Sequence, residues 1–298
     1  MSLQEPDWSK YLNDTDAAAT VLCKLLNAGE LALFVGAGIS RDLGAPSWHS
    51  LARAMAWKLN LGCGSINHKT KRGGDLAEIF DEIKERDSHF DAHIKKWLYF
   101  KWNKKSGNWA SDLLVALGSL MSGTIRGRVD TVLTLNFDSI LEMYLRLYGF
   151  RAQSISDFPC ILRRADVHIF HSHGYLPLDA EDGDDSGILL SKQNYLETMG
   201  EENNFRKRMM NYIIGQKRVL AVGLSGDDDF SRAALAALAK HGPHGSLVGF
   251  WVIGPHDSSA KVSALKASKI AAIRLPSFDY LPEFLFNIAR KASAATIP

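Results

Sequence analysis

Short apolar runs alternate with longer stretches of helical periodicity along most of the chain. A short apolar run bounded by turn residues is typical of a strand that is buried on both faces of a parallel sheet. Six such runs occur, at 31–35, 131–135, 167–171, 218–223, 247–253 and 271–275. Because the segments between most of them have helical patterns, we predict an α/β fold with an open, parallel, doubly wound sheet of about six strands.

Helical patterns fill the segments between these runs. We expect helices at about 17–26, 48–59, 75–86, 88–102, 109–121, 138–148, 192–214, 231–240 and 281–292. Four consecutive helical patterns separate the first strand from the second, so we expect residues 48–125 to form a helical insert module. Since no internal repeat is visible, we treat 1–298 as one domain that contains this insert.

The first predicted strand runs directly into a glycine turn, Gly36-Ala37-Gly38-Ile39-Ser40. Glycine lets another group approach the backbone closely, and N–H groups at the carboxyl edge of an α/β sheet commonly hold phosphates. We therefore expect a diphosphate-binding turn, and the alternative is a tight strand-to-helix turn with no ligand. A dehydrogenase fingerprint is excluded, because Arg41 stands where the third glycine of G-x-G-x-x-G would be.

Polar residues follow three further predicted strands. Asn136 and Asp138 come after the second strand, and His171 and His173 end the third. The fourth strand runs into 223–225. Because the carboxyl ends of parallel strands share one edge of a sheet, we expect these groups to converge on a ligand site. Each also has a simpler explanation, since Asp138 suits the N-cap of the next helix and His173 suits a turn.

Composition and charge narrow the class of protein. The net charge is only +2, with 46% apolar and 23% charged residues, so no overall basic field favours nucleic acid. The lysines and aromatic residues mixed at 95–105 are more simply explained by a helix that buries its aromatic face. Three widely separated cysteines, a polar N-terminus and the lack of long apolar runs favour a cytoplasmic protein without a membrane span.

The motifs, taken in order, resemble those of the sirtuin superfamily, above all the SIR2-like branch of bacterial anti-phage defence systems. The ordered set is Gly36-Ala37-Gly38-Ile39-Ser40, Asn136-x-Asp138, His173-Gly174 and Gly223-x-Ser225. The stretch from Gly38 to Trp48 is also similar to the G-x-S-x-x-x-G-x-P-x-W pattern of that branch. Because the motifs reach from about 31 to 279, the resemblance covers most of the chain.

The resemblance implies a Rossmann-like domain that binds NAD as its substrate, with a smaller helical module over the site. Deacylating sirtuins carry a zinc ribbon with paired C-x-x-C motifs, and this chain has none. We therefore expect no zinc, no other metal and no zinc ribbon. The defence branch is associated with cleavage of NAD+ to nicotinamide and ADP-ribose or cyclic forms, which depletes the cofactor. We expect the same activity here, in an abortive-infection effector.

The resemblance also implies roles for individual residues. Asn136 would position the attacking water or the nicotinamide ribose, and His173 would be the general base or polarise a ribose hydroxyl. Asp138 would orient the nicotinamide amide or help to cap the site. The N–H groups around Ala37 to Ser40 would hold the diphosphate. The adenosine side is assigned to Gly223, Ser225 and Asp279.

His171 competes with His173 for the catalytic role. Alternation along a strand sends both side chains to the same side, so geometry alone does not separate them. We prefer His173, because it precedes Gly174 as in the family pattern.

The family further implies a homo-oligomer and a defence partner, such as a HerA-type ATPase or an Argonaute-like protein. Two alternative functions remain. The first is a non-catalytic subunit that binds NAD or ADP-ribose, and the second is an NAD-dependent protein deacylase. Nicotinamide release distinguishes an enzyme from the binding subunit, and an acyl-ADP-ribose product would identify a deacylase.

Overall fold

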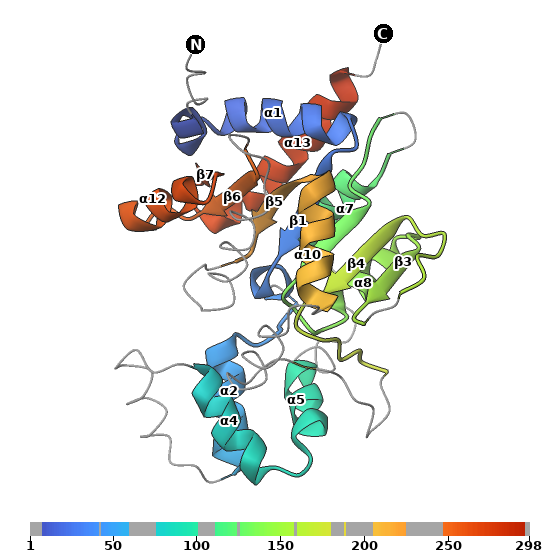
Figure 1. Cartoon of the computed structure of the whole chain (residues 1–298), viewed down its shortest axis with the longest axis vertical. Coiled ribbons are helices and arrows are strands. Elements are labelled where there is room, and N and C mark those ends of the chain that lie inside the picture. The colour runs from blue at the N-terminus through green and yellow to red at the C-terminus, as the bar shows by residue number, and fades with distance from the viewer. Residues whose placement is uncertain are drawn as a thin grey trace.

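A seven-stranded parallel sheet forms the centre of the molecule (Figure 1). The computed structural model describes residues 8–41, 43–59, 76–100, 111–123, 126–157, 160–179, 188, 205–224 and 247–295. The strands are β1 (Leu31–Val35), β2 (Thr131–Thr134), β3 (Ala152–Ile155), β4 (Val167–His171), β5 (Arg218–Val222), β6 (Gly249–Ile253) and β7 (Ile270–Arg274). Their order is β3-β4-β2-β1-β5-β6-β7, and every pair is parallel.

The sheet is wound in both directions from β1, which confirms the predicted doubly wound α/β fold. β2, β4 and β3 extend to one side of β1, and β5, β6 and β7 extend to the other. All five residues of β1 are buried, because apolar side chains alternate between the two covered faces. Leu33 lies in the core on one face and Phe34 in the core on the other. The point at which the strand order reverses lies at the end of β1, where such sheets bind ligands.

The structure has one strand more than the sequence pattern predicts. The additional strand is β3, whose sequence is Ala152-Gln153-Ser154-Ile155 and of which only Ile155 is fully buried. β3 pairs with β4 alone, at the edge of the sheet. An edge strand of this kind has no continuous apolar run, and the count of about six therefore missed it.

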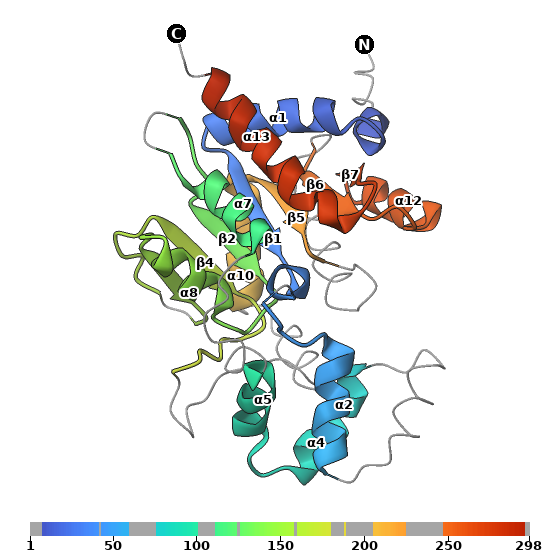
Figure 2. The same ribbon diagram turned by 180° about the vertical axis from the view of Figure 1, so that it is seen from behind.

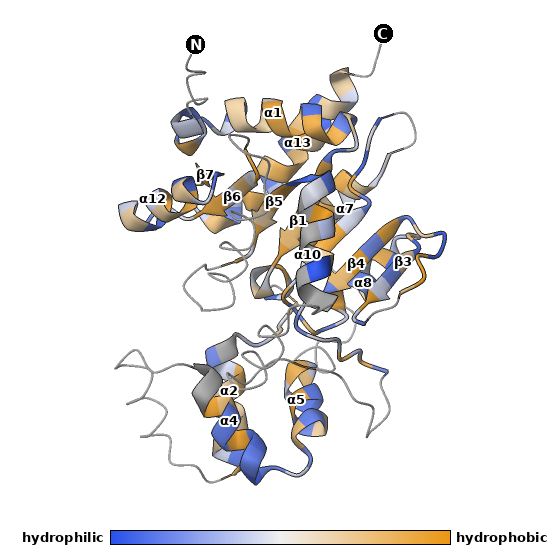
Figure 3. Ribbon diagram, in the orientation of Figure 1, coloured by the Kyte–Doolittle hydropathy of each residue, from blue (hydrophilic) through white to orange (hydrophobic). Residues whose placement is uncertain are grey.

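Helices cover both faces of the sheet. The helices are α1 (Thr15–Asn27), α2 (Trp48–Lys58), α4 (Leu76–Arg86), α5 (Phe90–Leu98), α7 (Asp112–Met121), α8 (Ile140–Leu147), α10 (Phe205–Gln216), α12 (Ser259–Ala267) and α13 (Leu281–Ala295). One core contains residues of α1, α7, α8 and α13, and the other contains residues of α10 and α12. Apolar residues dominate the central strands in Figure 3. Within the described ranges, no helix has the length and apolar character needed to cross a membrane.

Three helices of the expected insert lie together beyond one end of the sheet. Figures 1 and 2 both show α2, α4 and α5 next to the end at which the short 3-10 helix η2 (Ala37–Ser40) follows β1. α2 packs against both α4 and α5. α7 also falls within 48–125, but it packs against α13 and the sheet core. The helix expected at 231–240 lies outside the described residues.

Candidate functional site

The glycine turn after β1 is interlocked with the end of β5. Gly223 has a φ of +69°, a conformation that favours glycine. A Cβ at Gly38 would lie 2.7 Å from the Gly223 Cα, and one at Gly36 would lie 2.7 Å from the Gly223 oxygen. The three glycines therefore allow the two strand ends to meet backbone to backbone. The close approach that these glycines allow is made here by the end of β5, and diphosphate binding by the turn stays a prediction.

Some N–H groups of the turn are bonded to protein carbonyls. The Gly38 N–H donates to the Gly223 oxygen at 3.0 Å, and the Ile39 N–H donates to the Gly36 oxygen at 3.1 Å. Gly36 donates to the Val222 oxygen at 3.2 Å. Among the described residues, no hydrogen bond uses the N–H of Ala37. This N–H is thus the one in the turn best suited to an incoming anion.

Asn136 lies in the turn between β2 and α8 and is buried. Its backbone N–H donates to Thr134 Oγ1 at 2.9 Å. Its side-chain Nδ2 donates to the Gly36 oxygen at 3.3 Å and to Ser40 Oγ at 3.4 Å. These contacts hold the side-chain amide of Asn136 against the glycine turn. The residues that follow β2 and β1 therefore meet at one edge of the sheet.

Asp138 is buried beside the same serine. Its carboxylate accepts from Ser40 Oγ at 3.3 and 3.4 Å and from the Ile140 N–H at 3.0 Å. Burial removes the charged form from water and raises the pKa of Asp138 to about 6, and the nearby charge of Glu142 adds to this shift. The N-cap of α8 is Ser139. Asp138 precedes this N-cap by one residue and accepts a hydrogen bond from the first N–H of the helix, that of Ile140.

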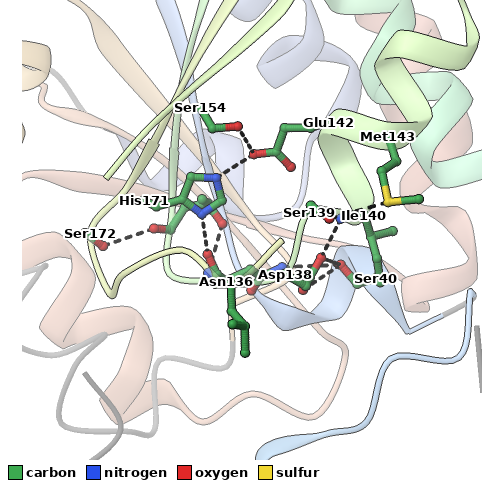
Figure 4. A network of polar contacts seen from close by, with 12 residues as sticks. Ser40, Asn136, Asp138, Ser139, Ile140, Glu142, Met143, Ser154, His171 and Ser172 are labelled. Atoms are coloured by element: carbon green, nitrogen blue, oxygen red, sulfur yellow. Dashed lines mark hydrogen bonds and ion pairs between the residues drawn. The ribbon is translucent and has the colours of Figure 1, made fainter. Parts of the chain in front are cut away.

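The two histidines have different surroundings, and Figure 4 shows those of His171. His171 Nδ1 lies 2.8 Å from the backbone oxygen of Asn136, and its Nε2 lies 2.5 Å from Glu142 Oε1. His173 Nδ1 lies 2.9 Å from Ser172 Oγ. Because the Ser172 hydroxyl donates to the Thr134 oxygen at 3.0 Å, it accepts from His173 Nδ1–H. The lone pair of a neutral His173 ring is then on Nε2.

The two rings are also linked to the Asn136 turn in different ways. Both nitrogens of His171 are committed to acceptor groups of the protein. His173 is joined to the Asn136 turn through Ser172 and Thr134, because Thr134 contacts both segments. The structure thus brings the ends of β1, β2 and β4 into one polar cluster.

Two buried residues of this cluster were missed by sequence reasoning. One is Glu142, which is 0% exposed and contacts His171. Glu142 follows Asp138 by four residues, so helical spacing alone places them on one face, and this signal could have identified it. The other is Tyr99, directly after α5, whose partners lie far away in the sequence and leave no such signal.

The Tyr99 hydroxyl joins the helical insert to the loops after β2 and β4. It accepts from the Ser139 N–H at 2.8 Å and donates to the Leu176 oxygen at 2.7 Å. Ser139 directly follows Asp138, and Leu176 follows His173 by three residues. One buried hydroxyl therefore fixes the two loops relative to each other and to the insert.

A small cavity lies between the insert and the polar cluster. Its volume is about 20 Å³, and its lining residues are Ala37, Ser40, Ala45, Pro46, Leu51, Leu98, Leu135, Asn136, Phe137 and Asp138. A cavity of this size has room for about one water molecule. The space beside Asn136 and Asp138 can therefore hold about one water molecule.

The remaining predicted residues are not brought to this cluster. Asp279 is exposed in the short helix η3 (Phe278–Tyr280), which follows the edge strand β7. β5 and β6 separate that strand from β1. Ser225 lies outside the described residues, so only Gly223 of its motif is placed. Within the described ranges, no group of three or more histidine, cysteine, aspartate or glutamate residues is arranged to hold a metal ion.

Comparison with known proteins supports the resemblance over part of the chain. Residues 130–273 match the family model of the SIR2-like domain. The matched segment contains Asn136, Asp138, His173 and Gly223, but neither β1 with its glycine turn nor the α2–α5 insert. No match was found among curated proteins.

A solved structure reported as a structural basis for the mechanism and regulation of Sir2 enzymes is also similar to this chain. The sequence identity is 14%, and the alignment covers 94% of this chain and 98% of that chain with a TM-score of 0.48.

Proposed function

We propose that this protein is an NAD+ glycohydrolase that cleaves the bond between nicotinamide and ribose, giving nicotinamide and ADP-ribose or a cyclic form. The observation that carries the proposal is the convergence of Ser40, Asn136, Asp138 and His173 at the carboxyl ends of three parallel strands. α/β sheets bind nucleotides at this edge, where the strand order reverses. The similarity of residues 130–273 to SIR2-like domains, which commonly use NAD, supports it.

The chemistry requires few groups from the protein. Cleavage develops positive charge on the ribose, as in other glycosyl transfers with an oxocarbenium-like transition state. Nicotinamide leaves from a cationic pyridinium, so no strong general acid is needed. The protein must hold the ribose, place a nucleophile and fix the diphosphate. The polar cluster supplies an amide, a carboxyl group and an imidazole for the first two tasks.

Asn136 is suited to orient the nucleophile. Its Nδ2 is used by Gly36 and Ser40, and its Oδ1 accepts no hydrogen bond from the described residues. This oxygen can accept from a water or from a ribose hydroxyl, and the adjacent one-water cavity gives such a group room. An amide transfers no proton itself, so we assign Asn136 to positioning.

His173 is suited to take the proton from that nucleophile. Imidazole exchanges protons near neutral pH, and the hydrogen bond from Nδ1 to Ser172 leaves Nε2 as the basic nitrogen. Asp138 would orient the nicotinamide amide. The Ala37 N–H and the neighbouring turn would contact the diphosphate, and Gly223, Ser225 and Asp279 would line the adenosine side.

We further propose a cytoplasmic effector of anti-phage defence that forms a homo-oligomer and acts with a partner protein. These roles come from the resemblance. Exposed apolar side chains offer surface for association, and among them are Leu147, Tyr148, Ile161 and Leu162. The lack of paired cysteine motifs speaks against the zinc-dependent form of protein deacylation.

One assay separates the three candidate activities. The purified chain, alone and with the products of neighbouring genes, is incubated with NAD+ in the presence and absence of an acylated peptide. We expect nicotinamide and ADP-ribose without peptide. An acyl-ADP-ribose product that requires the peptide would instead identify a deacylase. Binding of NAD+ by calorimetry with no product under any condition would identify a non-catalytic subunit.

A further inference from the structure

Glu142 is a fully buried carboxylate that neither the sequence motifs nor the proposed reaction uses. It lies in the first turn of α8 and is 0% exposed. Its Oε1 accepts from Ser154 Oγ at 3.1 Å and lies 2.5 Å from His171 Nε2. Its Oε2 has no hydrogen-bond partner among the described residues. An isolated buried carboxylate is strongly unfavourable, so the contact with His171 must compensate for its burial.

The hydrogen bonds of His171 constrain where its protons are. Nδ1 faces the backbone carbonyl oxygen of Asn136. This oxygen can only accept a hydrogen bond, so Nδ1 carries a hydrogen. A further proton is shared between Nε2 and Glu142 Oε1, because a carboxylate and a bare ring nitrogen would otherwise repel each other. With that proton on the ring, His171 is an imidazolium that donates at both nitrogens, and Glu142 is its counter-ion.

The other titratable groups around this pair are compatible with a positively charged ring. Asp138 faces the pair from the turn before α8, and its charge, when present, favours the imidazolium. The Tyr175 ring packs against His171 in a tilted arrangement, with ring centroids 4.4 Å apart and an angle of 47° between the planes. Burial and the charge of Glu142 raise the pKa of Tyr175 to about 12, so this side chain is neutral at physiological pH. Arg146, one turn further along α8, is exposed.

We propose that Glu142 is a positioning residue that holds Asn136 in its working orientation through a positively charged His171. The chain of contacts begins on α8, passes through the end of β4 and ends at the Asn136 peptide. From there the Asn136 side chain reaches the β1 turn. The functional part of this inference rests on the proposed NAD+ cleavage, in which Asn136 positions the nucleophile or the ribose.

A spectroscopic measurement tests the charge of His171 without any assay of activity. Protein labelled with ¹⁵N-histidine contains ten imidazole rings, and a His171→Asn variant assigns the ring of interest. We expect both nitrogens of His171 to be protonated in the wild type at pH 7.5, and we expect this signature to disappear in Glu142→Gln. A singly protonated His171 ring in the wild type would overturn the proposal. The wild-type spectrum alone decides this point, even if Glu142→Gln fails to fold.

Kinetics test the positioning role. Loss of a fixed orientation in an active site typically lowers the rate by about 10- to 100-fold. We expect kcat of Glu142→Gln to fall by about this factor while its circular dichroism spectrum stays unchanged. The control is Glu283→Gln, on the exposed surface of α13, which we expect to retain full activity. An unchanged kcat in folded Glu142→Gln would contradict the role. A wild type that cleaves no NAD+ would refute the proposed function, whereas the spectrum alone would still decide the charge of His171.

Discussion

Asp138 is a buried carboxyl group whose charge lowers the stability of the fold. Its pKa is raised to about 6, chiefly by burial, whereas an unfolded chain has the ordinary value of 3.8. Between these two values the folded protein binds the proton more tightly than the unfolded chain does. The free energy of unfolding therefore falls as the pH rises from about 4 to about 6, and it stays lowered above that range. A buried ionisable group that reduces stability at working pH is typical of functional sites.

The first prediction follows from this linkage. Asp138→Asn keeps an oxygen that can accept from the Ile140 N–H but removes the charge. We expect the variant to gain up to about 3 kcal/mol of stability at pH 8 and clearly less at pH 5. Urea unfolding at the two pH values measures this difference. A variant whose advantage is the same at both pH values, or larger at pH 5, would contradict the assigned pKa.

The second prediction concerns the choice between the two histidines. His173→Ala should retain its fold and lose NAD+ cleavage, since it removes the proposed base. His256 is exposed, and His256→Ala should keep the wild-type rate. A His173→Ala protein that consumes NAD+ at the normal rate would refute the assignment of the base.

Among the structural elements, the junction between the insert and the sheet has the greatest consequence for the site. Tyr99 directly follows the insert helix α5 and bonds the loops after β2 and β4. Leu51 and Leu98 of the insert line the cavity beside Asn136. The position of the insert is therefore linked to the geometry of the loops after β2 and β4.

The third prediction tests this link. Tyr99→Phe keeps the ring but removes the hydroxyl that satisfies Ser139 and Leu176. We expect a loss of about 1 to 3 kcal/mol in stability, because two buried backbone groups lose their partner. We also expect a lower kcat, measured below the melting temperature. Tyr212 on α10 is exposed, and Tyr212→Phe should change neither quantity. Full activity of Tyr99→Phe would show that the insert does not position the loops.

The fourth prediction concerns the contact between the ends of β1 and β5. Gly38→Ala would bring a Cβ to 2.7 Å from the Gly223 Cα, so the backbone must shift. We expect a marked fall in the melting temperature together with loss of activity. Gly118 lies inside α7 with nothing within 4 Å of its Cβ position, so Gly118→Ala should stabilise the protein by about 0.5 to 1 kcal/mol. A Gly38→Ala protein as stable as the wild type would contradict the tight packing of the two turns.

At the scale of the whole molecule, the sequence predicted the parts better than their arrangement. All six predicted strands are present, with bounds that differ by at most two residues, because strands buried on both faces have continuous apolar runs. The edge strand β3 escaped detection because its residues are half exposed. The order of the seven strands depends on contacts between distant segments, which local periodicity does not encode.

The same distinction explains which parts of the site were predictable. Asn136, Asp138 and Ser40 were identified because parallel strands bring their carboxyl ends to one edge, and the structure does bring these three together. The spacing of Glu142 from Asp138 was a usable signal for the residue, but its contact with His171, 29 residues away, leaves no trace in the sequence. Tyr99 was missed because its partners lie 40 and 77 residues further along the chain. Such buried contacts become visible only once the fold is known.

The measurement that tests the central claim most directly is nicotinamide release from NAD+ by the wild type and by Asn136→Ala at equal concentrations of folded protein. We expect the wild type to release nicotinamide and the variant to be at least about 100-fold slower, because the nucleophile loses its fixed position. Equal rates for the two proteins, or no release by the wild type alone and with its partner, would contradict the assignment of this cluster as an NAD+-cleaving site.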